Sequence, residues 1–435
     1  MIGVKYMLKK KIILTIFEKQ IIRNLILNNQ GKLLKTLIDN FEVTILTNSE
    51  LYTILDELLN QFDEKIFNIV VVEVIKQNLA YKSLGVFAKN MNSSPSNIWS
   101  RNRNYALKNF GLLGLFFRIL VNKLFSNSQF FHIMLRTSMS YLIFNRKLSS
   151  STTFKSCDVL ILTSTTNSKW DVPIGHIASR KNKKIVSIPR SWDNFTSHGA
   201  MRINPNKIYS FSPIMSKYLK EYHFFNENQI IEVKNPAYDN RNHFSEKQFS
   251  IPSRNQKILY ACMGTHLFEQ EAIFIDNLSE QVRLSGFDLE ILMHPKFKTP
   301  NHKGINFKSI SYEQFSTHDL LFEHLSNYRL ILTAGSSIAL DCFNYNLEFV
   351  CVFIEDLPID YWRSIKRYTD NVEHFSDFLR LNNIKVIHHF DQLQIELRNA
   401  KIRPLHRAGA SNISYTEAPC ISDELINTIN RIISQ

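Results

Sequence analysis

The 435-residue chain contains few glycines and prolines, 12 of each, and only five cysteines. The cysteines are widely spaced and none belongs to a CxxC pair, which argues against a disulfide framework and favours a reducing cytoplasm. We expect all five to be buried structural thiols: Cys157, Cys262, Cys342, Cys351 and Cys420.

No apolar stretch reaches the length of a transmembrane helix. The closest, FGLLGLFFRILVNKLF at 110–125, is broken by Arg118 and Lys123. We interpret it as a buried amphipathic helix, and the alternative is a helix resting on a membrane face with its cations near lipid phosphate. The N-terminal segment lacks a small-residue cleavage site and is interpreted as a first strand, not a signal peptide.

Several catalytic motifs are also absent from the sequence. GxxxxGK[ST], HExxH and GxSxG do not occur, so we expect no P-loop, no metal site and no serine hydrolase, and no cofactor is predicted. The formal net charge is +13, which would attract phosphorylated or anionic partners. The Lys and Arg residues are scattered without a nucleic-acid motif, so no nucleic-acid partner is predicted.

Apolar strands alternate with helices in two separate blocks, and the chain is too long for one core. This pattern predicts an α/β protein with two Rossmann-like domains that face each other across a cleft. The predicted parts are a first domain at 1–240 with a helical insertion at about 60–150, a linker at 241–256, a second domain at 257–420 and a terminal helix at 421–435.

The segment LTAGSSIALD gives the sharpest local signal for a ligand. An apolar strand runs into Gly335, Ser336 and Ser337, and a helix follows at once, which suits a phosphate at a helix N-terminus. Asp341 lies one helical turn further on and could reach a ribose hydroxyl. The alternative is a plain serine N-cap.

Two other loops of the second block are weaker candidates for donor contacts. LEILMHPKF ends at His294 and Pro295 with Lys296 adjacent, so the His and Lys could neutralise phosphate, although a His after a strand is often only a polar loop residue. YACMGTHLFEQE places Gly264 and Thr265 after a strand, a turn that could also contact phosphate.

The loop VSIPRSWDNFTSHGA at 186–200 is unusually rich in polar side chains beside a large ring. Asp193 is the preferred general base for an acceptor hydroxyl. Trp192 and Asn194 are predicted to line the acceptor site, and a core ring is the alternative for Trp192.

Three further residues of the first block are candidates. Thr165 lies at a strand end and is assigned to acceptor binding together with Arg23. Asp171 is the reserve base, and its alternative role is a helix N-terminal carboxylate before Pro173.

These residues together resemble GT-B glycosyltransferases of bacterial surface-polysaccharide synthesis. The related superfamily includes CDP-glycerol glycerophosphotransferases, Kdo transferases and bacterial sialyltransferases, with UDP-GlcNAc 2-epimerase as a cousin. SWDNFTSHG resembles a Ser-Trp-Asp-Asn-x-Thr-x-x-Gly signature, and VKNPAYD at 233–239 resembles the segment that closes the first domain. His294-Pro295 and Ser336-Ser337 resemble paired motifs whose His and serines contact the donor phosphate in CMP-sugar transferases.

The resemblance implies metal-independent transfer of a sugar from a nucleotide-sugar to a surface-polysaccharide or lipid-linked glycan acceptor. Together with the cysteine usage, it predicts a cytoplasmic enzyme, and peripheral contact with the inner membrane face is retained as an alternative. The acidic Asp/Glu-Asp/Glu-Gly motif of sialyltransferases is absent. Three alternatives stay open: a UDP-sugar 2-epimerase, a CDP-glycerol-type polyol phosphate transferase and a non-catalytic membrane scaffold.

Overall fold

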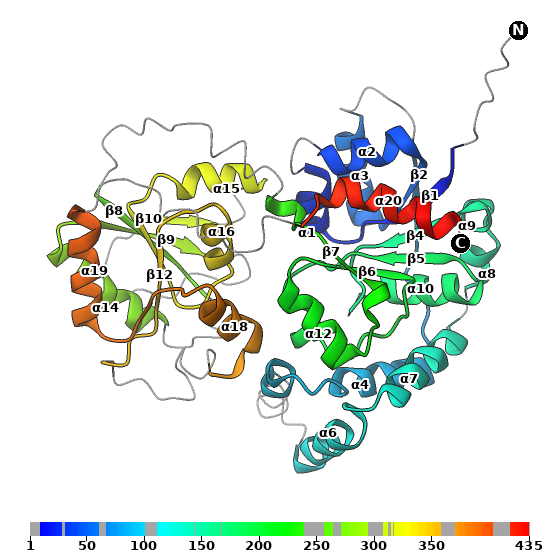
Figure 1. Cartoon of the computed structure of the whole chain (residues 1–435), viewed down its shortest axis with the longest axis horizontal. Coiled ribbons are helices and arrows are strands. Elements are labelled where there is room, and N and C mark those ends of the chain that lie inside the picture. The colour runs from blue at the N-terminus through cyan, green and yellow to red at the C-terminus, as the bar shows by residue number, and fades with distance from the viewer. Residues whose placement is uncertain are drawn as a thin grey trace, which may run out of the picture. The chain divides into compact units, whose positions relative to one another are not determined.

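The computed structural model of the chain forms two compact units. Unit 1 comprises Met1–Pro236 and Glu417–Gln435, and unit 2 comprises Ala237–Thr416 (Figure 1). The structure describes residues 9–27, 31–60, 67–100, 111–143, 145–166, 168–238, 256–263, 271–294, 308–311, 315, 317–357, 370–402 and 418–434. The predicted linker therefore lies outside the described residues except for Gln256.

Unit 1 is built on a parallel sheet whose seven described strands follow the order β3-β2-β1-β4-β5-β6-β7. Most of these strands are short runs of β-branched and other apolar residues, as expected where helices cover both faces of a parallel sheet. The order reverses between β1 and β4, and that point is where α/β sheets usually bind ligands. The strands are β1 (Lys11–Thr15), β2 (Glu42–Thr47), β3 (Phe67–Val71), β4 (Val159–Leu162), β5 (Lys184–Ser187), β6 (Lys207–Ser210) and β7 (Ile230–Glu232).

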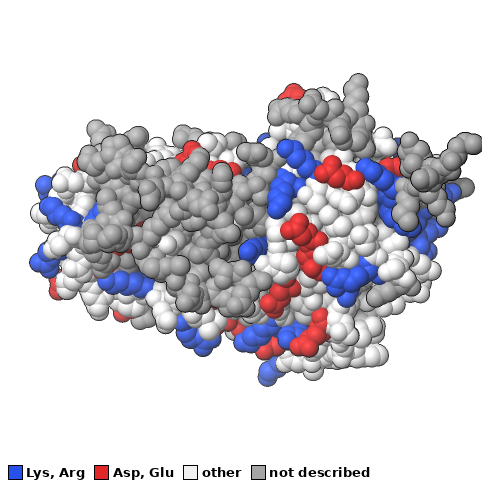
Figure 2. Space-filling model, turned by 45° about the horizontal axis from the view of Figure 1, so that its top comes forward, with Lys and Arg blue, Asp and Glu red and all other residues white. Residues whose placement is uncertain are grey.

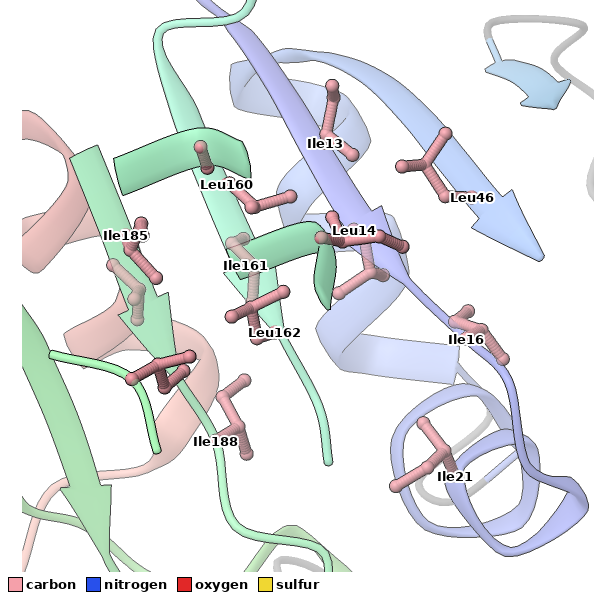
Figure 3. Close-up of a cluster of buried hydrophobic side chains, with 14 of the residues drawn as sticks. Ile13, Leu14, Ile16, Ile21, Leu46, Leu160, Ile161, Leu162, Ile185 and Ile188 are labelled. Atoms are coloured by element: carbon pink, nitrogen blue, oxygen red, sulfur yellow. The ribbon is translucent and has the colours of Figure 1, made fainter. Parts of the chain in front are cut away.

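The core of unit 1 lies on both sides of its central strands. Figure 3 shows the apolar side chains of β1, β4 and β5, with Ile13, Ile161 and Ile185 among them, and each of these three is 1% exposed or less. Full burial of such a side chain contributes roughly 1.5–3 kcal/mol. The helices of unit 1 before β4 are α1 (Lys19–Ile21), the π-helix η1 (Ile22–Leu27), α2 (Lys32–Asn40), α3 (Ser49–Leu59), α4 (Leu79–Asn90), α6 (Gly111–Phe125), α7 (Gln129–Leu142), α8 (Arg146–Ser150) and α9 (Thr152–Ser156).

The predicted helical insertion is present, with one correction at its start. β3 lies inside the range predicted as helical, because the β-branched run at its end pairs in register with β2. The insertion therefore begins only after Val71, and its described part includes α4, α6, α7, α8 and α9. The later helices of unit 1 are α10 (Asp171–Arg180), α11 (Asn194–Ser197), α12 (Pro213–His223) and the short η3 (Glu227–Gln229).

The prediction of a buried amphipathic helix at 110–125 is wrong for the apolar face of α6. Leu113, Phe116 and Leu124 are exposed, whereas Arg118 is buried. None of the described helices combines the length and the hydropathy that spanning a lipid bilayer requires.

Unit 2 repeats the architecture with six described parallel strands in the order β10-β9-β8-β11-β12-β13. Its order reverses between β8 and β11, which pair directly. The strands are β8 (Lys257–Ala261), β9 (Asp288–Met293), β10 (Lys308–Ser311), β11 (Leu330–Thr333), β12 (Phe349–Val352) and β13 (Val386–Ile387). Its longer helices are α14 (Glu271–Leu284), α15 (His318–Leu325), α16 (Ile338–Asn344), α18 (Glu373–Leu381) and α19 (Phe390–Ile402). The two sheets confirm the predicted α/β class with two Rossmann-like domains.

The predicted terminal helix is α20 (Ile421–Ser434), and it belongs to unit 1. It contacts α2 and β5, and its residues Leu425 and Ile429 are fully buried in the core of unit 1. The Lys234 N–H also donates to the Pro419 carbonyl at 3.0 Å. The chain therefore returns to its first unit after completing the second.

Candidate functional site

The carboxyl ends of β1 and β4 hold a buried carboxylate, Asp171, at the switch point of unit 1. Asp171 is the first residue of α10, and its Oδ1 accepts hydrogen bonds from the Thr15 hydroxyl and from the Thr163 N–H, the latter at 3.3 Å. Ser168 Oγ donates to Oδ2 at 2.9 Å. Burial raises the pKa of Asp171 from 3.8 to about 6, against the lowering effect of these hydrogen bonds. Because the carboxylate is fully enclosed and bonded, this geometry favours its structural alternative, a helix N-terminal carboxylate.

A second carboxylate at the same switch point, Glu18, is reachable from solvent. Arg190, from the loop after β5, pairs with Glu18 Oε2 at 2.6 Å, and the Ser164 hydroxyl donates to Oε1 at 3.0 Å. The Glu18 side chain is 31% exposed. Sequence reasoning missed this cluster. The available signal was an acidic residue directly after the first apolar strand, but its partners lie 146 and 172 residues away.

The polar loop after β5 contains the short helix α11, with Asp193 as its N-cap residue. The Asp193 carbonyl accepts from the N–H groups of Thr196 and Ser197, while its side chain makes no capping bond. One carboxylate oxygen lies 3.8 Å from His198 Nε2, and the side chain is about as exposed as that of Glu18. The Asp193 carboxylate is therefore reachable from solvent, and His198 lies close enough to pair with it or to accept a proton from it.

The Asn194 side chain hydrogen-bonds to the backbone of the same loop. Its Oδ1 accepts hydrogen bonds from the N–H groups of Arg190 at 2.9 Å and Ser191 at 3.1 Å, and the side chain is almost completely buried. This differs from the acceptor-binding role predicted for Asn194. Its contacts make it a residue that shapes the loop and so orients the neighbouring Asp193.

Residues of the helical insertion hydrogen-bond to the loop after β5. Asn92, just after α4, donates from Nδ2 to the carbonyls of Phe195 at 3.1 Å and Gly199 at 3.3 Å. Ser94 Oγ donates to the Thr196 carbonyl at 2.5 Å. Side chains from residues about a hundred positions earlier therefore bond to two carbonyls of α11 and to the carbonyl of Gly199.

Gly199 marks the closest approach between this loop and the insertion. Its φ is +83°, and a Cβ added there would lie 2.6 Å from Lys89 Cα. The next residue, Ala200, donates its N–H to the Ala88 carbonyl at 2.9 Å. Glycine is required because both the left-handed backbone and the contact with α4 exclude a side chain.

A buried His–Arg pair completes the support of the loop. His223, at the end of α12, accepts from the Met201 N–H at Nδ1 and donates from Nε2 to the Phe195 carbonyl at 2.7 Å. Arg136, from α7, donates to the carbonyls of Met201 and His223 and lies 4.4 Å from the centre of the Phe225 ring. Burial lowers the pKa of His223 from 6.5 to about 3, and it lowers the pKa of Arg136 to about 9.

The other acceptor-side candidates occupy different surroundings. Thr165 is buried, and its hydroxyl accepts from Ser187 Oγ at 2.8 Å. Trp192 is partly buried and packs against the core of unit 1, in line with its core-ring alternative. Arg23 is half-buried on η1.

In unit 2 the predicted turn after β11 lies at the switch point beside β8. Gly335 has φ +115°, and the Ser336 N–H donates to Thr333 Oγ1 at 3.0 Å. Ser336 is buried, and its hydroxyl accepts from the Ile338 N–H, so Ser336 has the N-cap-like alternative role. Ser337 differs, because it is exposed and its side chain makes no capping bond to α16.

Asp341 has surroundings that do not suit the ribose contact predicted for it. It is nearly fully buried, and the Tyr238 hydroxyl donates to its Oδ1 at 2.8 Å. His318 Nδ1 lies 3.6 Å from the same oxygen. These contacts make Asp341 a structural link between α16 and α15.

His294 directly follows β9, which pairs with β8, and its side chain is half-buried at the carboxyl edge of the sheet. The remaining donor candidates, Gly264, Thr265, Pro295 and Lys296, lie outside the described residues. Within the described ranges, no group of three or more His, Cys, Asp or Glu side chains is placed to hold a metal ion.

Solved structures with the same fold cover nearly the whole chain. Arabidopsis thaliana UGT89C1 complexed with quercetin matches 98% of this chain and all of its own, at 14% identity and a TM-score of 0.52. The same protein complexed with UDP-L-rhamnose matches 98% and 99% of the two chains at 12% identity and a TM-score of 0.51. A Listeria monocytogenes protein assigned as a UDP-N-acetylglucosamine 2-epimerase matches 97% and 96%, at 12% identity and a TM-score of 0.51.

These likenesses establish the two-domain Rossmann-like fold of GT-B type. No model of a protein family matches the sequence, and no curated protein matches it either.

Proposed function

We propose that this protein is a glycosyltransferase that moves a sugar from a nucleotide-sugar to a surface-polysaccharide or lipid-linked glycan acceptor. The observation that carries the proposal is the turn at Gly335 to Ser337, at the switch point of unit 2. Gly335 adopts a positive φ directly before α16, and Ser337 is exposed and makes no side-chain capping bond. Such a turn offers N–H and hydroxyl donors to a phosphate.

Sugar transfer leaves negative charge on the departing nucleotide phosphate, so preorganised donors at that phosphate lower the barrier. In our proposal Ser337 and the backbone of the turn bind the donor phosphate. His294, two strands away at the same edge, assists its departure, with Lys296 nearby in sequence. Ser336 holds the turn in place, and Gly264 and Thr265 are proposed as further phosphate contacts.

Unit 1 is proposed to bind the acceptor and to remove its proton. Asp193 is the preferred base because its carboxylate is reachable and lies close to His198. Glu18 is the rival, because it occupies the switch point with Ser164 and Arg190. Trp192 and Arg23 remain proposed acceptor contacts, whereas Thr165 is the weakest proposed contact and Asp171 the weakest candidate base, because both are buried.

Two solved structures support different members of this enzyme class. The complex of UGT89C1 with UDP-L-rhamnose supports use of the fold by a nucleotide-sugar enzyme. The Listeria monocytogenes protein supports the alternative, a UDP-sugar 2-epimerase. Epimerisation needs no acceptor, so a C2 isomer formed from the donor alone would favour the alternative.

The test is a panel of CMP-, UDP-, GDP- and CDP-linked donors, including CDP-glycerol, in binding and turnover assays with the full chain. We expect one donor class to bind and to be hydrolysed or transferred. Ser337→Ala should weaken donor binding by about tenfold, the effect of losing one hydrogen bond to a charged group. Asp193→Asn should leave donor binding intact and reduce turnover by about 10²–10⁴.

Glu18→Gln is the matched variant that separates the two candidate bases. If Glu18→Gln abolishes turnover while Asp193→Asn does not, the base is Glu18 and the assignment of Asp193 fails. If no donor binds to protein that unfolds cooperatively, the enzyme proposal itself is wrong.

A further inference from the structure

Helix α6 presents an apolar stripe to solvent. Its most exposed large side chains are Leu113, Phe116, Phe117, Leu120 and Leu124, which recur at the spacing of one helical face. Phe116 is 65% exposed. A face of this kind on a globular protein normally marks an interaction surface.

The orientation of α6 is inverted relative to an ordinary surface helix. Arg118, the charged residue in the middle of the helix, is only 5% exposed, and Val121 beside it is buried. Surface helices usually bury their apolar face and leave Arg in water. The fold therefore turns the more apolar face of α6 outward.

Helix α7 repeats the pattern. Phe130, Ile133, Met134 and Tyr141 are exposed at the same helical spacing, and Phe130 is 68% exposed. A short turn connects the two helices, and the ring of Phe131 packs edge-on against Phe125 with centroids 4.6 Å apart. We call the exposed apolar residues of α6 and α7 the hairpin surface. In Figure 1, α4, α6 and α7 lie together along one edge of unit 1.

The charge of the whole chain is concentrated in the segment that carries the hairpin surface. The 84 residues between Glu73 and Asp158 contain 12 Lys and Arg and no Asp or Glu, which leaves 40 basic and 39 acidic residues elsewhere. The net charge of +13 therefore comes almost entirely from this segment, because it lacks acidic residues, while its Lys and Arg are scattered as they are elsewhere in the chain. Lys123 and Lys147 are exposed among its described residues.

We propose that the hairpin surface docks on an anionic phospholipid bilayer. Bulky apolar side chains at helical spacing enter the boundary between head groups and acyl chains, and surrounding cations interact with lipid phosphate. We call residues 74–157, which contain no Asp or Glu, the acid-free segment. Such a segment suits an anionic membrane, where each Lys or Arg near the surface adds to the attraction. In this proposal the two helices lie in the plane of the interface.

The test is flotation of the full chain with vesicles of phosphatidylcholine alone or mixed with phosphatidylglycerol. We expect binding to the mixed vesicles and little to phosphatidylcholine. Phe116→Gln combined with Phe130→Gln should weaken binding by about tenfold or more, because two aromatic side chains no longer leave water. Lys123→Glu, on the exposed side of α6, should also weaken it, and so should raising the salt from about 0.1 to about 1 M.

Leu284→Gln is the matched control, because Leu284 is 63% exposed on α14 of unit 2 and lies far outside the acid-free segment in sequence. It should bind vesicles as the unchanged protein does. Thermal unfolding of all variants should be unaltered, since each change is on an exposed side chain. The readout does not involve catalysis, so it is independent of the proposed function.

Two results would overturn the proposal. One is equal vesicle binding by the Phe116/Phe130 variant and the unchanged protein. The other is no vesicle binding together with a dimer, seen by light scattering, that this variant converts to monomer, because the hairpin surface would then bind a second copy of the chain.

Discussion

His132, His176 and His223 are buried in unit 1, and each has a pKa well below that of an exposed histidine. Burial is the main cause, and it lowers the pKa of His132 from 6.5 to about 4 and those of His176 and His223 to about 3. The unfolded chain therefore takes up protons more readily than the folded one between these values. Because the folded state holds these histidines in their neutral form, the free energy of unfolding is not reduced by them above about pH 6.5. Below that pH it falls, because the unfolded state binds the protons.

Asp171 acts in the opposite direction. Its folded pKa of about 6 lies above its unfolded value of 3.8, so lowering the pH through 6 stabilises the folded state. At about pH 5 each histidine costs about 2 kcal/mol, whereas Asp171 returns about 1 kcal/mol. The three histidines together outweigh Asp171, so we expect the free energy of unfolding of unit 1 to fall as the pH is lowered.

His176→Leu tests this at a single position. His176 Nε2 has no hydrogen-bond partner among the described residues, so its removal should be nearly neutral at about pH 8. The loss of stability between about pH 7.5 and 5 should shrink by about 2 kcal/mol, measured by urea unfolding across the pH range. An unchanged pH dependence would mean that His176 is not buried in its neutral form.

At the scale of elements, the helical insertion acts as a support for the loop after β5. Asn92 and Ser94 bond to the carbonyls of α11, and Gly199 packs directly on the backbone of α4. The loop that carries Asp193 is therefore held by a segment far from it in sequence. The position of Asp193 depends on that contact.

Gly199→Ala should destabilise unit 1 by about 2–4 kcal/mol, because the new Cβ combines a left-handed backbone with a backbone clash. Gly85→Ala, in α4 itself, is the control. Its Cβ would meet only Arg202 at 3.6 Å, so the change should be neutral or stabilise the helix by up to about 1 kcal/mol. Chemical unfolding measures both, and equal effects of the two changes would contradict the proposed close contact.

At the scale of the whole molecule, acidic and basic residues are mixed outside the acid-free segment. Figure 2 shows Lys and Arg interspersed with Asp and Glu on the face that it displays. The chain also closes on itself through α20, which fills the core of unit 1 after the chain has formed unit 2.

Leu425→Ala should therefore weaken unit 1 by about 2–5 kcal/mol, although Leu425 follows unit 2 in sequence. The matched change Leu397→Ala removes an equally buried side chain from α19 of unit 2. Calorimetry or proteolysis of the two units should assign the first change to unit 1 and the second to unit 2. If Leu425→Ala destabilised unit 2 and left the stability of unit 1 unchanged, the placement of α20 would be contradicted.

Much of the fold follows from local sequence pattern. Apolar runs such as Val159–Leu162 predict strands, and the change from strand to helix around Gly335 to Ser337 is visible in ten residues. These signals are local because strand and helix periods repeat within a few residues. β3 was not predicted, because a five-residue strand beside a long helical stretch carries little periodic signal.

The sequence by itself determined the α/β class, the terminal helix and the turn at Ser337, because each depends on neighbours in the chain. Only the tertiary structure decided which polar groups meet. Glu18 finds Ser164 and Arg190, Asp341 finds Tyr238, and the inner face of α6 becomes the one that holds Arg118. The order of strands in the sheets and the packing of distant helices bring these groups together, and no local pattern encodes that order.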